Sequence, residues 1–559
     1  MARARDRRRN TGREEDGQEW RGRCAGRVRR RPHRDALRHR HTLQGHSRVL
    51  GARIQEERFS EHQSCVHGAP RVNYHQSQRT EAVKRVVIIG GGIAGLATAY
   101  SLREHSDAPF EIRLIERKDR LGGNIRTERA SGFLIEGGPD CFLSEKPWAM
   151  ELCKRVGLGD ELLPTNEHNR KTFVLSRGKL HVLPEGVILM VPTKILPLAT
   201  SSLISVPGKI RMAMELFVPK RKGPRDESLG DFVRRRLGAE ALEKIAEPLV
   251  AGVHAGDPET MSVRASFPKF VQLEEDYGSL IKGMLKKLEL LKKTHKPAAG
   301  TPNKRVTMFM TLKNGLGSLI DTLQEKVSSS KDTVVATGVN VSGVERKADA
   351  YEITIEGGEK IAADAVVIAA PAYAAASLVR FDKELPAKLL TIPYVSTATV
   401  SIAFRKKDIK HPLNGFGFVV PKVEKRKIMA ATWTSVKFSL RAPDDSVLIR
   451  CFVGGSKDTS LLGASDEEMV RTVRQELKDI MGIDAEPVLS RVFRWMNSMP
   501  QYTIGHEERI DWIDERVAGY PGFYLVGSAY HGIGISDSVR YAEIVAKKVL
   551  HHIKASKPQ

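Results

Sequence analysis

The stretch VKRVVIIGGGIAGLATAYSLREHSDAPFEIRLIERKDRLGGNIRT, residues 83–127, decides the fold of this 559-residue chain. Four consecutive apolar residues, 86–89, lead into a GxGxxG motif at 90–95 and then into a run with helical spacing. A second apolar run ends at Glu116, 21 residues after the last glycine of the motif. A strand, a glycine turn, a helix and a second strand that ends in an acid form the unit that binds a dinucleotide. The stretch therefore predicts a Rossmann-like α/β domain.

The glycines of this motif have separate tasks. Gly90 permits the tight turn, Gly92 lets the backbone approach a pyrophosphate, and Gly95 lets the helix pack closely on the strand. The N–H groups at the start of the helix face the phosphates, and the carboxylate of Glu116 accepts hydrogen bonds from the ribose hydroxyls. We therefore expect the dinucleotide to contact Gly90, Gly91, Gly92, Ile93, Ala94, Gly95 and Glu116.

A second loop rich in glycine and arginine, RLGGNIRT at 120–127, follows the acid directly. A nicotinamide-binding domain has no need of such a loop. A flavin dinucleotide is buried along its whole length, so it needs a second set of backbone N–H groups and a cation near its phosphates. An ordinary surface turn is the alternative interpretation. The cofactor predicted from these residues is FAD, held in addition by Arg117, Arg120, Gly123 and Asn124.

The first 83 residues differ in composition from the rest of the chain. They contain 20 Arg, no Lys and 10 acidic residues, and so supply +10 of the net charge of +23. They lack the apolar centre of a secretory signal, and their acidic run argues against an organelle transit peptide. A nucleic-acid-binding arm is an alternative that we do not favour. We expect residues 1–82 to be a disordered Arg-rich extension, and we expect no nucleic acid as a partner.

Length and composition set further limits. A chain of 559 residues with 41% apolar residues has material for two or three soluble domains. Its five cysteines include no C-x-x-C pair, which favours a reducing compartment. No apolar run is long enough to span a membrane. The histidines show no ligand spacing, so we expect no metal.

Elements of the cofactor domain return late in the chain. Strand patterns occupy 334–371, and GFYLVGSAYHGIGISD at 522–537 gives a strand, a glycine turn and the start of a long helix. We therefore predict an α/β fold with α+β insertions, in which the FAD-binding domain is built from the discontinuous segments 83–165, 306–375 and 488–559. A strand-rich substrate-binding domain then takes 166–186 and 376–487, and a helical domain takes 187–305.

One segment of the helical domain, residues 187–218, is strongly apolar, is broken by three prolines and is edged by lysines and arginines. Apolar helices flanked by cations are typical of a membrane surface or of the mouth of an apolar channel. A helical lid over an ordinary core is the alternative. We expect this segment to make a peripheral membrane contact or to form the mouth of an apolar channel.

Three further stretches carry a resemblance to a known family. They are SLGDFVRRRLGAEALEKIAEPLVAGVHAGDPETMSVRASFP at 228–268, TWTSVKF at 432–438 and GSAYHGIGISD at 527–537. Together with GGGIAG, Glu116 and RLGGNIRT, they make residues 83–559 resemble the oxygen-dependent protoporphyrinogen/coproporphyrinogen III oxidases of haem synthesis, within the flavin amine oxidase superfamily.

The resemblance implies that a porphyrinogen is oxidised to a porphyrin through FAD, with O₂ as the acceptor and H₂O₂ as a product. Hydride transfer to a flavin depends mainly on placement in a dry slot, so no catalytic side chain is expected with certainty. Trp433 fits a core position as well as it fits a flavin contact. The further cofactor contacts that the resemblance implies are Gly138, Pro139, Asp140, Cys141, Val339, Trp433, Gly527, Gly532, Ile533, Gly534 and Ile535.

The propionates of such a substrate need cations. The resemblance places them just before the strand FVL, at Lys171 and secondly at Arg170, although either could be a solvated loop charge. The apolar segment 187–218 slightly favours protoporphyrinogen IX over the more highly charged coproporphyrinogen III. Rival functions are another flavin oxidase or desaturase, acting on amines or polyenes, and a non-catalytic scaffold that has lost its flavin.

Further expectations concern partners and location. We expect a cytoplasmic protein, peripheral on the cytoplasmic face of the inner membrane. A homodimer and hand-over of the porphyrin to ferrochelatase are also expected.

Overall fold

The computed structural model describes residues 83–106, 108–188, 190–192, 194–223, 225–294, 306–456 and 458–555. Every described residue belongs to one compact unit, 77–559. The predicted extension, residues 1–82, therefore lies outside the described residues.

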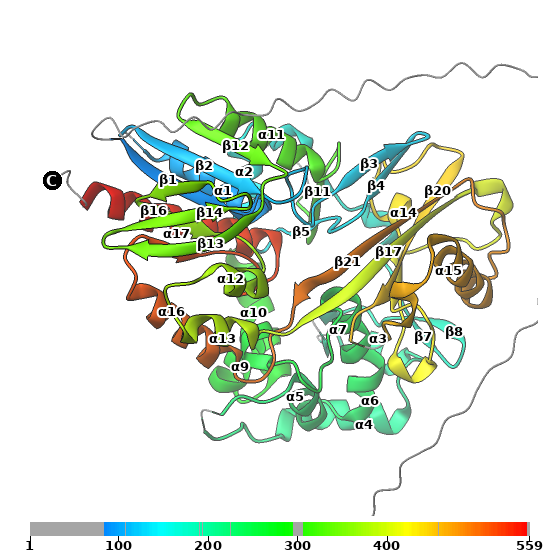
Figure 1. Cartoon of the computed structure of the whole chain (residues 1–559). Helices are drawn as coiled ribbons and strands as arrows, with labels where there is room; N and C mark the ends of the chain where they lie inside the picture. The colour runs from blue at the N-terminus through cyan, green and yellow to red at the C-terminus, as the bar shows by residue number, and fades with distance from the viewer. Residues whose placement is uncertain are drawn as a thin grey trace, which may run out of the picture. The chain divides into compact units, whose positions relative to one another are not determined.

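A five-stranded parallel sheet with the order β12-β2-β1-β16-β22 forms the predicted cofactor domain (Figure 1). Strands β1 and β16, two of its three inner strands, consist mainly of buried β-branched residues, as a parallel sheet covered on both faces requires. Segments far apart in the sequence thus build one sheet, as predicted. Its strands are β1 (Lys84–Ile89), β2 (Phe110–Glu116), β12 (Thr333–Thr337), β16 (Ala365–Ile368) and β22 (Phe523–Leu525).

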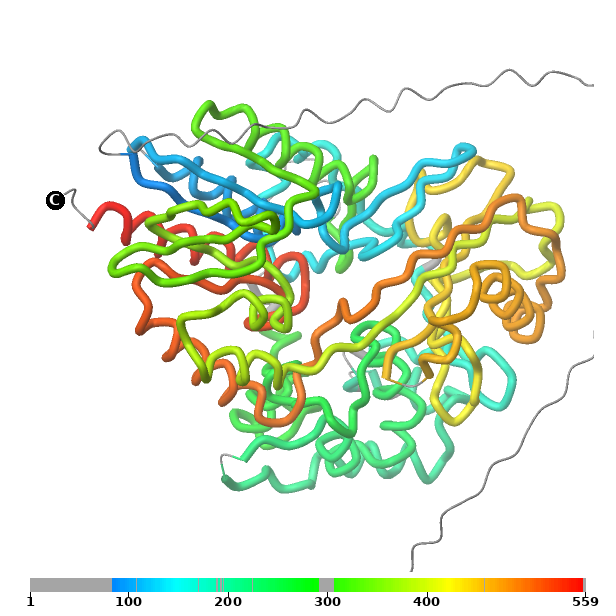
Figure 2. Tube along the Cα trace, viewed as in Figure 1, coloured from blue at the N-terminus to red at the C-terminus, as the bar shows by residue number. Residues whose placement is uncertain are grey.

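Each face of the parallel sheet has its own core, because alternate residues of β1 point to opposite sides. The first and last described segments run side by side in Figure 2, where α1 packs on α17. The first core contains α1 (Ile93–Glu104), α2 (Trp148–Arg155), α11 (Gly317–Ser328) and α17 (Ile535–Ala555). The second contains β13 (Val341–Lys347), β14 (Ala350–Ile355), β15 (Lys360–Ala363), α12 (Ala372–Leu378), α13 (Glu384–Leu390) and α16 (His506–Ala518).

A seven-stranded sheet with the order β21-β17-β20-β19-β18-β7-β8 confirms the predicted strand-rich region. One face packs on α15 (Asp466–Met481) in a core that includes Phe404 and Trp433. The strands are β7 (Thr172–Ser176), β8 (Lys179–Val182), β17 (Tyr394–Arg405), β18 (Gly417–Val419), β19 (Ala430–Trp433), β20 (Ser446–Gly454) and β21 (Leu489–Pro500), and α14 (Thr434–Lys437) follows β19.

The predicted helical region is confirmed by a run of helices that shares a core with one face of the seven-stranded sheet. Helix α5 begins after Ser228, whose hydroxyl oxygen accepts from the Asp231 N–H at 2.9 Å. These helices are α3 (Ile195–Thr200), α4 (Val206–Ala213), α5 (Leu229–Arg236), α6 (Ala239–Ala241), α7 (Glu247–His254), α8 (Val263–Ser266), α9 (Pro268–Tyr277) and α10 (Leu280–Thr294).

Short strands complete the architecture and connect the larger parts. They are the pair β3 (Thr127–Ala130) and β4 (Phe133–Glu136), the three-stranded group β5 (Phe142–Leu143), β11 (Phe309–Leu312) and β6 (Leu162–Pro164), and the pair β9 (Val187–Ile188) and β10 (Val191–Pro192).

Two of the predicted domain boundaries move. Strand β21 was assigned to the cofactor domain, but it pairs with β17 over nearly its whole length and belongs to the seven-stranded sheet. Helix α13 was assigned to the substrate domain, but it packs in the second core of the parallel sheet. Hydrophobic periodicity identifies an element without saying which sheet it joins, and this explains both shifts.

Candidate functional site

The glycines of the first motif differ in what surrounds them. A methyl group on Gly95 would lie 1.9 Å from the carbonyl oxygen of Gly90, so the helix can approach the strand only through a glycine. A methyl group on Gly92 would instead meet open space, with the Gly123 Cα at 3.8 Å as the nearest atom. Packing therefore explains Gly95. The free space in front of Gly92 fits the approach of a pyrophosphate, as the sequence predicts.

Glu116 is fixed at the mouth of this turn. Its carboxylate accepts hydrogen bonds from the Gly91 N–H at 2.7 Å and from the Lys118 N–H at 2.9 Å. The N–H of Val339 donates to the Glu116 carbonyl at 3.0 Å. The structure thus brings Val339, a predicted cofactor contact, beside Glu116, the predicted acceptor for the ribose hydroxyls. Arg117, by contrast, is exposed.

The second loop is joined directly to the first, because the Gly122 N–H donates to the Gly91 carbonyl at 2.8 Å. Arg120 stabilises this loop: its guanidinium donates to the carbonyls of Leu121 at 3.1 Å and Gly123 at 2.8 Å. Part of the donor capacity of Arg120 is therefore used within the loop, and its contact with a phosphate stays a prediction. We call Gly90–Gly95, Glu116 and Arg120–Asn124 together the dinucleotide site.

The turn at residues 137–141 lies next to this site. A methyl group on Gly138 would be 1.7 Å from the carbonyl oxygen of Asn124, so the turn and the second loop are in close contact. The Gly137 carbonyl accepts from the Thr399 hydroxyl and from the Trp495 indole N–H, each at 2.8 Å. Strands β17 and β21 thus hold the predicted flavin-side turn from the seven-stranded sheet.

Arg450 on β20 adds a cation to this arrangement. Its guanidinium donates to the carbonyls of Gly137 and Gly138. The residue is 4% exposed, and its Nε has no partner among the described residues. Burial lowers the pKa of Arg450, and the nearby carboxylate of Asp140 opposes this shift. A buried charge with an unused donor fits a site that receives an anionic or strongly polar group.

Asp140 and Lys437 form an ion pair at the end of the turn, with Nζ and Oδ2 3.0 Å apart. Burial alone would raise the pKa of Asp140, but Lys437 and Arg450 outweigh it and hold the pKa well below its usual range. Burial raises the pKa of the Cys141 thiol to about 12. At neutral pH the pair is therefore charged and the thiol protonated, so none of the three is poised as a general acid or base.

Glu136 is the carboxyl group in this region that titrates near neutrality. It accepts from the Thr127 hydroxyl and from the Leu316 N–H, each at 2.7 Å. Burial raises its pKa to about 7, although both hydrogen bonds oppose the shift. Its position links strand β4 to the start of α11 rather than to open space, so it is a structural group.

The C-terminal glycine turn precedes α17. Gly527 and Gly532 have φ angles of +139° and +129°, which only glycine adopts readily. Ile535, the first residue of α17, is buried in the core of the parallel sheet. Lys146 pairs with Asp537 in the first helical turn, at 2.6 Å. The predicted contacts Gly532, Ile533, Gly534 and Ile535 thus lie together at the start of a 21-residue helix.

Two sequence predictions are not supported by the structure. Trp433 has no exposed surface and packs against Phe173 and His411, so it is a core residue of the strand-rich region. Arg170 is 70% exposed and pairs with Glu167. Lys171 is also exposed and lies just before β7. Neither cation has a described contact with the dinucleotide site.

Sequence reasoning missed Arg450 and Tyr502. A signal for Arg450 was present, because it is a single cation in the otherwise apolar strand SVLIRCFVG. Tyr502 gave no comparable signal. Its hydroxyl contacts the C-terminal glycine turn, 26 and 30 positions further along the chain.

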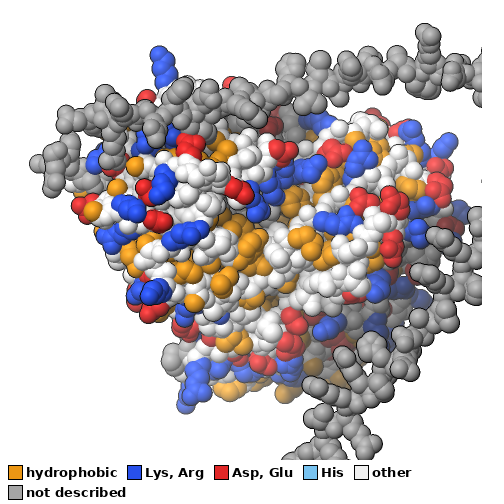
Figure 3. Space-filling model, in the orientation of Figure 1, with side chains coloured by type: hydrophobic (Ala, Val, Ile, Leu, Met, Phe, Trp, Pro, Cys, Tyr) orange, Lys and Arg blue, Asp and Glu red, His pale blue; other side chains and the backbone are white. Residues whose placement is uncertain are grey.

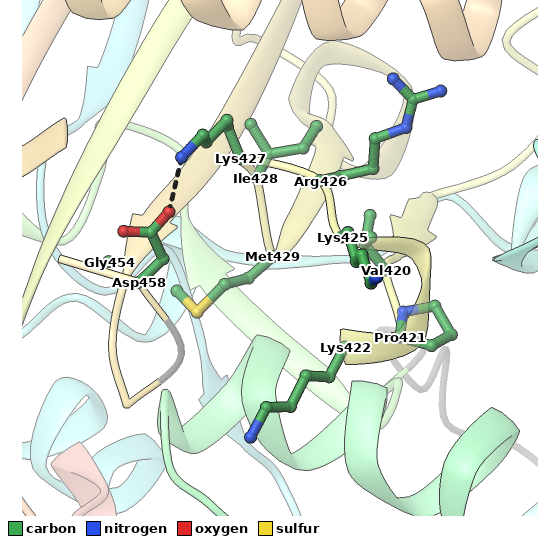
Figure 4. A pocket seen from close by; sticks show the side chains of 10 residues that line it. All are labelled: Val420, Pro421, Lys422, Lys425, Arg426, Lys427, Ile428, Met429, Gly454 and Asp458. Atoms are coloured by element: carbon green, nitrogen blue, oxygen red, sulfur yellow. Dashed lines mark hydrogen bonds and ion pairs between the residues drawn. The ribbon is translucent and has the colours of Figure 1, made fainter. Parts of the chain in front are cut away.

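A separate hollow of about 210 Å³ lies beside strands β18 and β19 (Figure 4). It is rich in lysine, and one of its lysines, Lys427, pairs with Asp458 at 2.9 Å. Its volume is below the range of about 300–1,000 Å³ that is usual for small-molecule sites. It also shares no residue with the dinucleotide site, so we do not assign the chemistry to it. Among the described residues, no group of three or more His, Cys, Asp or Glu could hold a metal ion.

Comparison with known proteins decides the family. Residues 93–550 match the family model described as flavin containing amine oxidoreductase. The chain belongs to this family. Membership confirms the predicted fold class and FAD as the cofactor. The residues present fit FAD, because space is free in front of Gly92, Glu116 is held at the turn, and Arg450 keeps an unused buried donor.

Relatives within this flavoprotein family cover most of the chain. The coproporphyrinogen III oxidase of Bacillus subtilis is 36% identical over 482 residues, which are 85% of this chain and 99% of the relative. The chloroplastic protoporphyrinogen oxidase 1 of Arabidopsis thaliana is 31% identical and covers 83% and 87%. A crystal structure of a candidate protoporphyrinogen oxidase from Exiguobacterium superposes with a TM-score of 0.73 at 33% identity, covering 84% and 99%. The predicted resemblance is thereby confirmed.

Proposed function

We propose that this flavoprotein oxidises a porphyrinogen to the corresponding porphyrin, with O₂ as the electron acceptor and H₂O₂ as a product, in haem biosynthesis. The observation that carries the proposal is the similarity to a coproporphyrinogen III oxidase along 99% of that relative. A further coproporphyrinogen III oxidase, from Staphylococcus aureus, is 33% identical over 469 residues. Both exceed the 31% identity to the Arabidopsis protoporphyrinogen oxidase 1.

Coproporphyrinogen III is therefore the substrate we favour, and protoporphyrinogen IX is the second candidate. The sequence alone leaned slightly to protoporphyrinogen IX, because an apolar helical segment suits a less charged substrate. The higher identity to the coproporphyrinogen III oxidases, whose substrate carries four propionates, weighs more than the apolar character of one segment.

FAD bound at this site would be the electron acceptor for each two-electron oxidation, and O₂ would be the final acceptor. The protein binds and orients it: Glu116 and the dinucleotide site hold the adenosine and phosphate end, and the 137–141 turn is fixed by three strands of the second sheet. The Asp140–Lys437 pair stays charged and exchanges no proton near neutrality. Placement of the substrate, rather than acid–base catalysis by a side chain, is thus the task of this chain.

Aerobic incubation of the purified holoprotein with coproporphyrinogen III and, separately, with protoporphyrinogen IX tests the proposal. We expect porphyrin fluorescence to rise faster than in an autoxidation control, with a higher kcat/KM for coproporphyrinogen III. Turnover of an amine or a polyene without any gain in porphyrin fluorescence would favour the rival flavin oxidase. A higher kcat/KM for protoporphyrinogen IX would reverse the order of the two substrates.

We also propose a peripheral membrane contact through α4 and its flanking residues. Several apolar side chains are exposed there: Leu196 at 74%, Val206, Ile210, Met214 and Phe217 at 84%. Lys220 and Lys222 follow them and are exposed too. Figure 3 shows hydrophobic side chains along the lower margin of the molecule, where Figure 1 places α4 and α5. No described helix is both long and apolar enough to cross a bilayer.

A further inference from the structure

Tyr502 lies in the segment PQYTIGH, residues 500–506, outside every dinucleotide motif. Its side chain is buried, and its hydroxyl has two partners on one turn. It donates to the Ser528 carbonyl at 2.8 Å and accepts from the Gly532 N–H at 2.7 Å. The hydroxyl therefore closes the turn that precedes α17.

The position of the Tyr502 ring is itself fixed. The ring stacks on His506, with centroids 3.8 Å apart and an angle of 15° between the planes. Burial lowers the pKa of His506 to about 4, so the imidazole is neutral at pH 7. Its Nε2 lies 3.3 Å from the Tyr530 carbonyl, on the same turn. Two stacked side chains thus contact three backbone groups of one glycine turn.

The turn has a backbone shape that only glycine adopts readily at Gly527 and Gly532, and these contacts hold it in place. Without the phenol hydroxyl, the half-buried Gly532 N–H loses its described acceptor, and leaving a partly buried N–H unpaired has a cost. The turn would then relax, and the start of α17 would relax with it.

The backbone of Tyr502 binds a different part of the molecule. Its carbonyl accepts from the Ser262 N–H at 2.8 Å, and the Ile504 N–H donates to the Thr260 carbonyl at 3.1 Å. Ser262 begins α8 in the helical region. One residue therefore joins the helical region, through its backbone, to the glycine turn of the parallel-sheet domain, through its side chain.

We propose that Tyr502 is a positioning residue for FAD: it couples the helical region to the Gly527–Gly532 turn and thereby sets the affinity for the cofactor. This inference rests on the flavin binding of the family and on the predicted contacts of Gly527 and Gly532. It does not depend on which substrate is oxidised.

The test compares Tyr502→Phe with a matched control, Tyr351→Phe. Tyr351 is equally buried, and its hydroxyl donates to the Pro521 carbonyl at 2.9 Å, outside the turn. Each apoprotein is titrated with FAD, flavin fluorescence is followed, and the Tm without FAD is recorded. We expect Y502F to raise the Kd for FAD roughly tenfold, because it removes both hydrogen bonds of the hydroxyl to the turn, and Y351F to change it less than about twofold.

The Tm values separate positioning from stability, because both variants should lower the Tm of the apoprotein by similar amounts. Equal changes in Kd for the two variants, or an unchanged Kd in Y502F, would overturn the proposal. If Y502F does not accumulate as folded protein, His506→Leu removes the stacked ring and leaves the hydroxyl. A raised Kd in H506L supports the proposal and an unchanged one refutes it. Porphyrinogen turnover is not part of the readout, so the two proposals fail independently.

Discussion

The guanidinium of Arg450 donates to the carbonyl oxygen of Gly138, across 312 positions of the sequence. Arg450 lies on β20 of the seven-stranded sheet, and Gly138 lies in the turn that touches the dinucleotide site. The same guanidinium reaches the Gly137 carbonyl, which also accepts from Thr399 and Trp495. The turn at residues 137–141 is thus held by the strand-rich region rather than by its own neighbours in sequence.

Replacing Arg450 with Met should destabilise the protein by about 2–3 kcal/mol. Met keeps most of the volume but leaves the Gly138 carbonyl without its described donor and removes a charge that balances Asp140. The free energy of unfolding in urea, at equal FAD saturation, measures the effect. The control is Arg491→Met, which breaks an exposed pair with Glu128 and should cost less than about 1 kcal/mol. Equal losses would mean that Arg450 has no special role in holding the turn.

Gly92 and Gly95 should respond in opposite ways to the same methyl group. Gly92→Ala places the methyl in open space, so the apoprotein should keep its Tm. The methyl would fill the space of the pyrophosphate, and we expect FAD affinity to fall at least about tenfold. Gly95→Ala would collide with the Gly90 carbonyl oxygen at 1.9 Å and should lower the Tm of the apoprotein instead. Apoprotein Tm and FAD titration check both variants.

Two results would contradict this assignment. Full FAD affinity in G92A would place the cofactor elsewhere, and an unchanged Tm in G95A would show that the strand and helix can move apart without cost.

Glu136 should make stability depend on pH. Its folded pKa of about 7 lies above the ordinary value of 4.5, so the native state binds the proton more tightly than the unfolded chain. The stabilising contribution is full below pH 4.5 and is lost as pH rises through 7, and it amounts to about 3 kcal/mol. In Glu136→Gln the side chain cannot ionise, so this loss of stability at higher pH should disappear. The difference in unfolding free energy between E136Q and wild type, measured from pH 5 to pH 8, isolates this group from the histidines, because both proteins share them.

The free energy of unfolding of E136Q, relative to that of the wild type, should therefore increase as pH rises. A difference that stays constant across this pH range would show that Glu136 is already ionised in the folded protein at pH 5.

The dinucleotide site was predictable because its information is local. The glycines, the helix and Glu116 lie within one stretch, and each glycine has a steric task that the sequence spacing expresses. The connection between the two glycine loops, Gly122 N–H to Gly91, also lies within that stretch. Local sequence thus predicted the part of the site that one supersecondary unit builds.

Arg450 and Tyr502 could not be assigned in the same way. Their partners are the carbonyl of Gly138 and the N–H of Gly532. Nearly every residue carries such backbone groups, so the sequence does not mark these two as partners, and only tertiary folding brings them close. For Trp433 the sequence left a core position and a flavin contact equally open, and the ring lies in the core between the seven-stranded sheet and α15. Motif spacing describes contacts within an element, whereas these contacts join segments that are far apart in the sequence.

The exposed apolar side chains near α4 predict binding to anionic vesicles. Ile210 and Phe217 are 59% and 84% exposed, and lysines follow them. The double change Ile210→Ser with Phe217→Ser should reduce co-sedimentation with phosphatidylglycerol vesicles at least tenfold, since burying each side chain contributes about 1.5–3 kcal/mol. Leu390→Ser, on α13, is the control: Leu390 is 62% exposed, and its loss should leave binding unchanged. Equal losses in both variants, or no binding of the wild type at low salt, would refute the membrane contact.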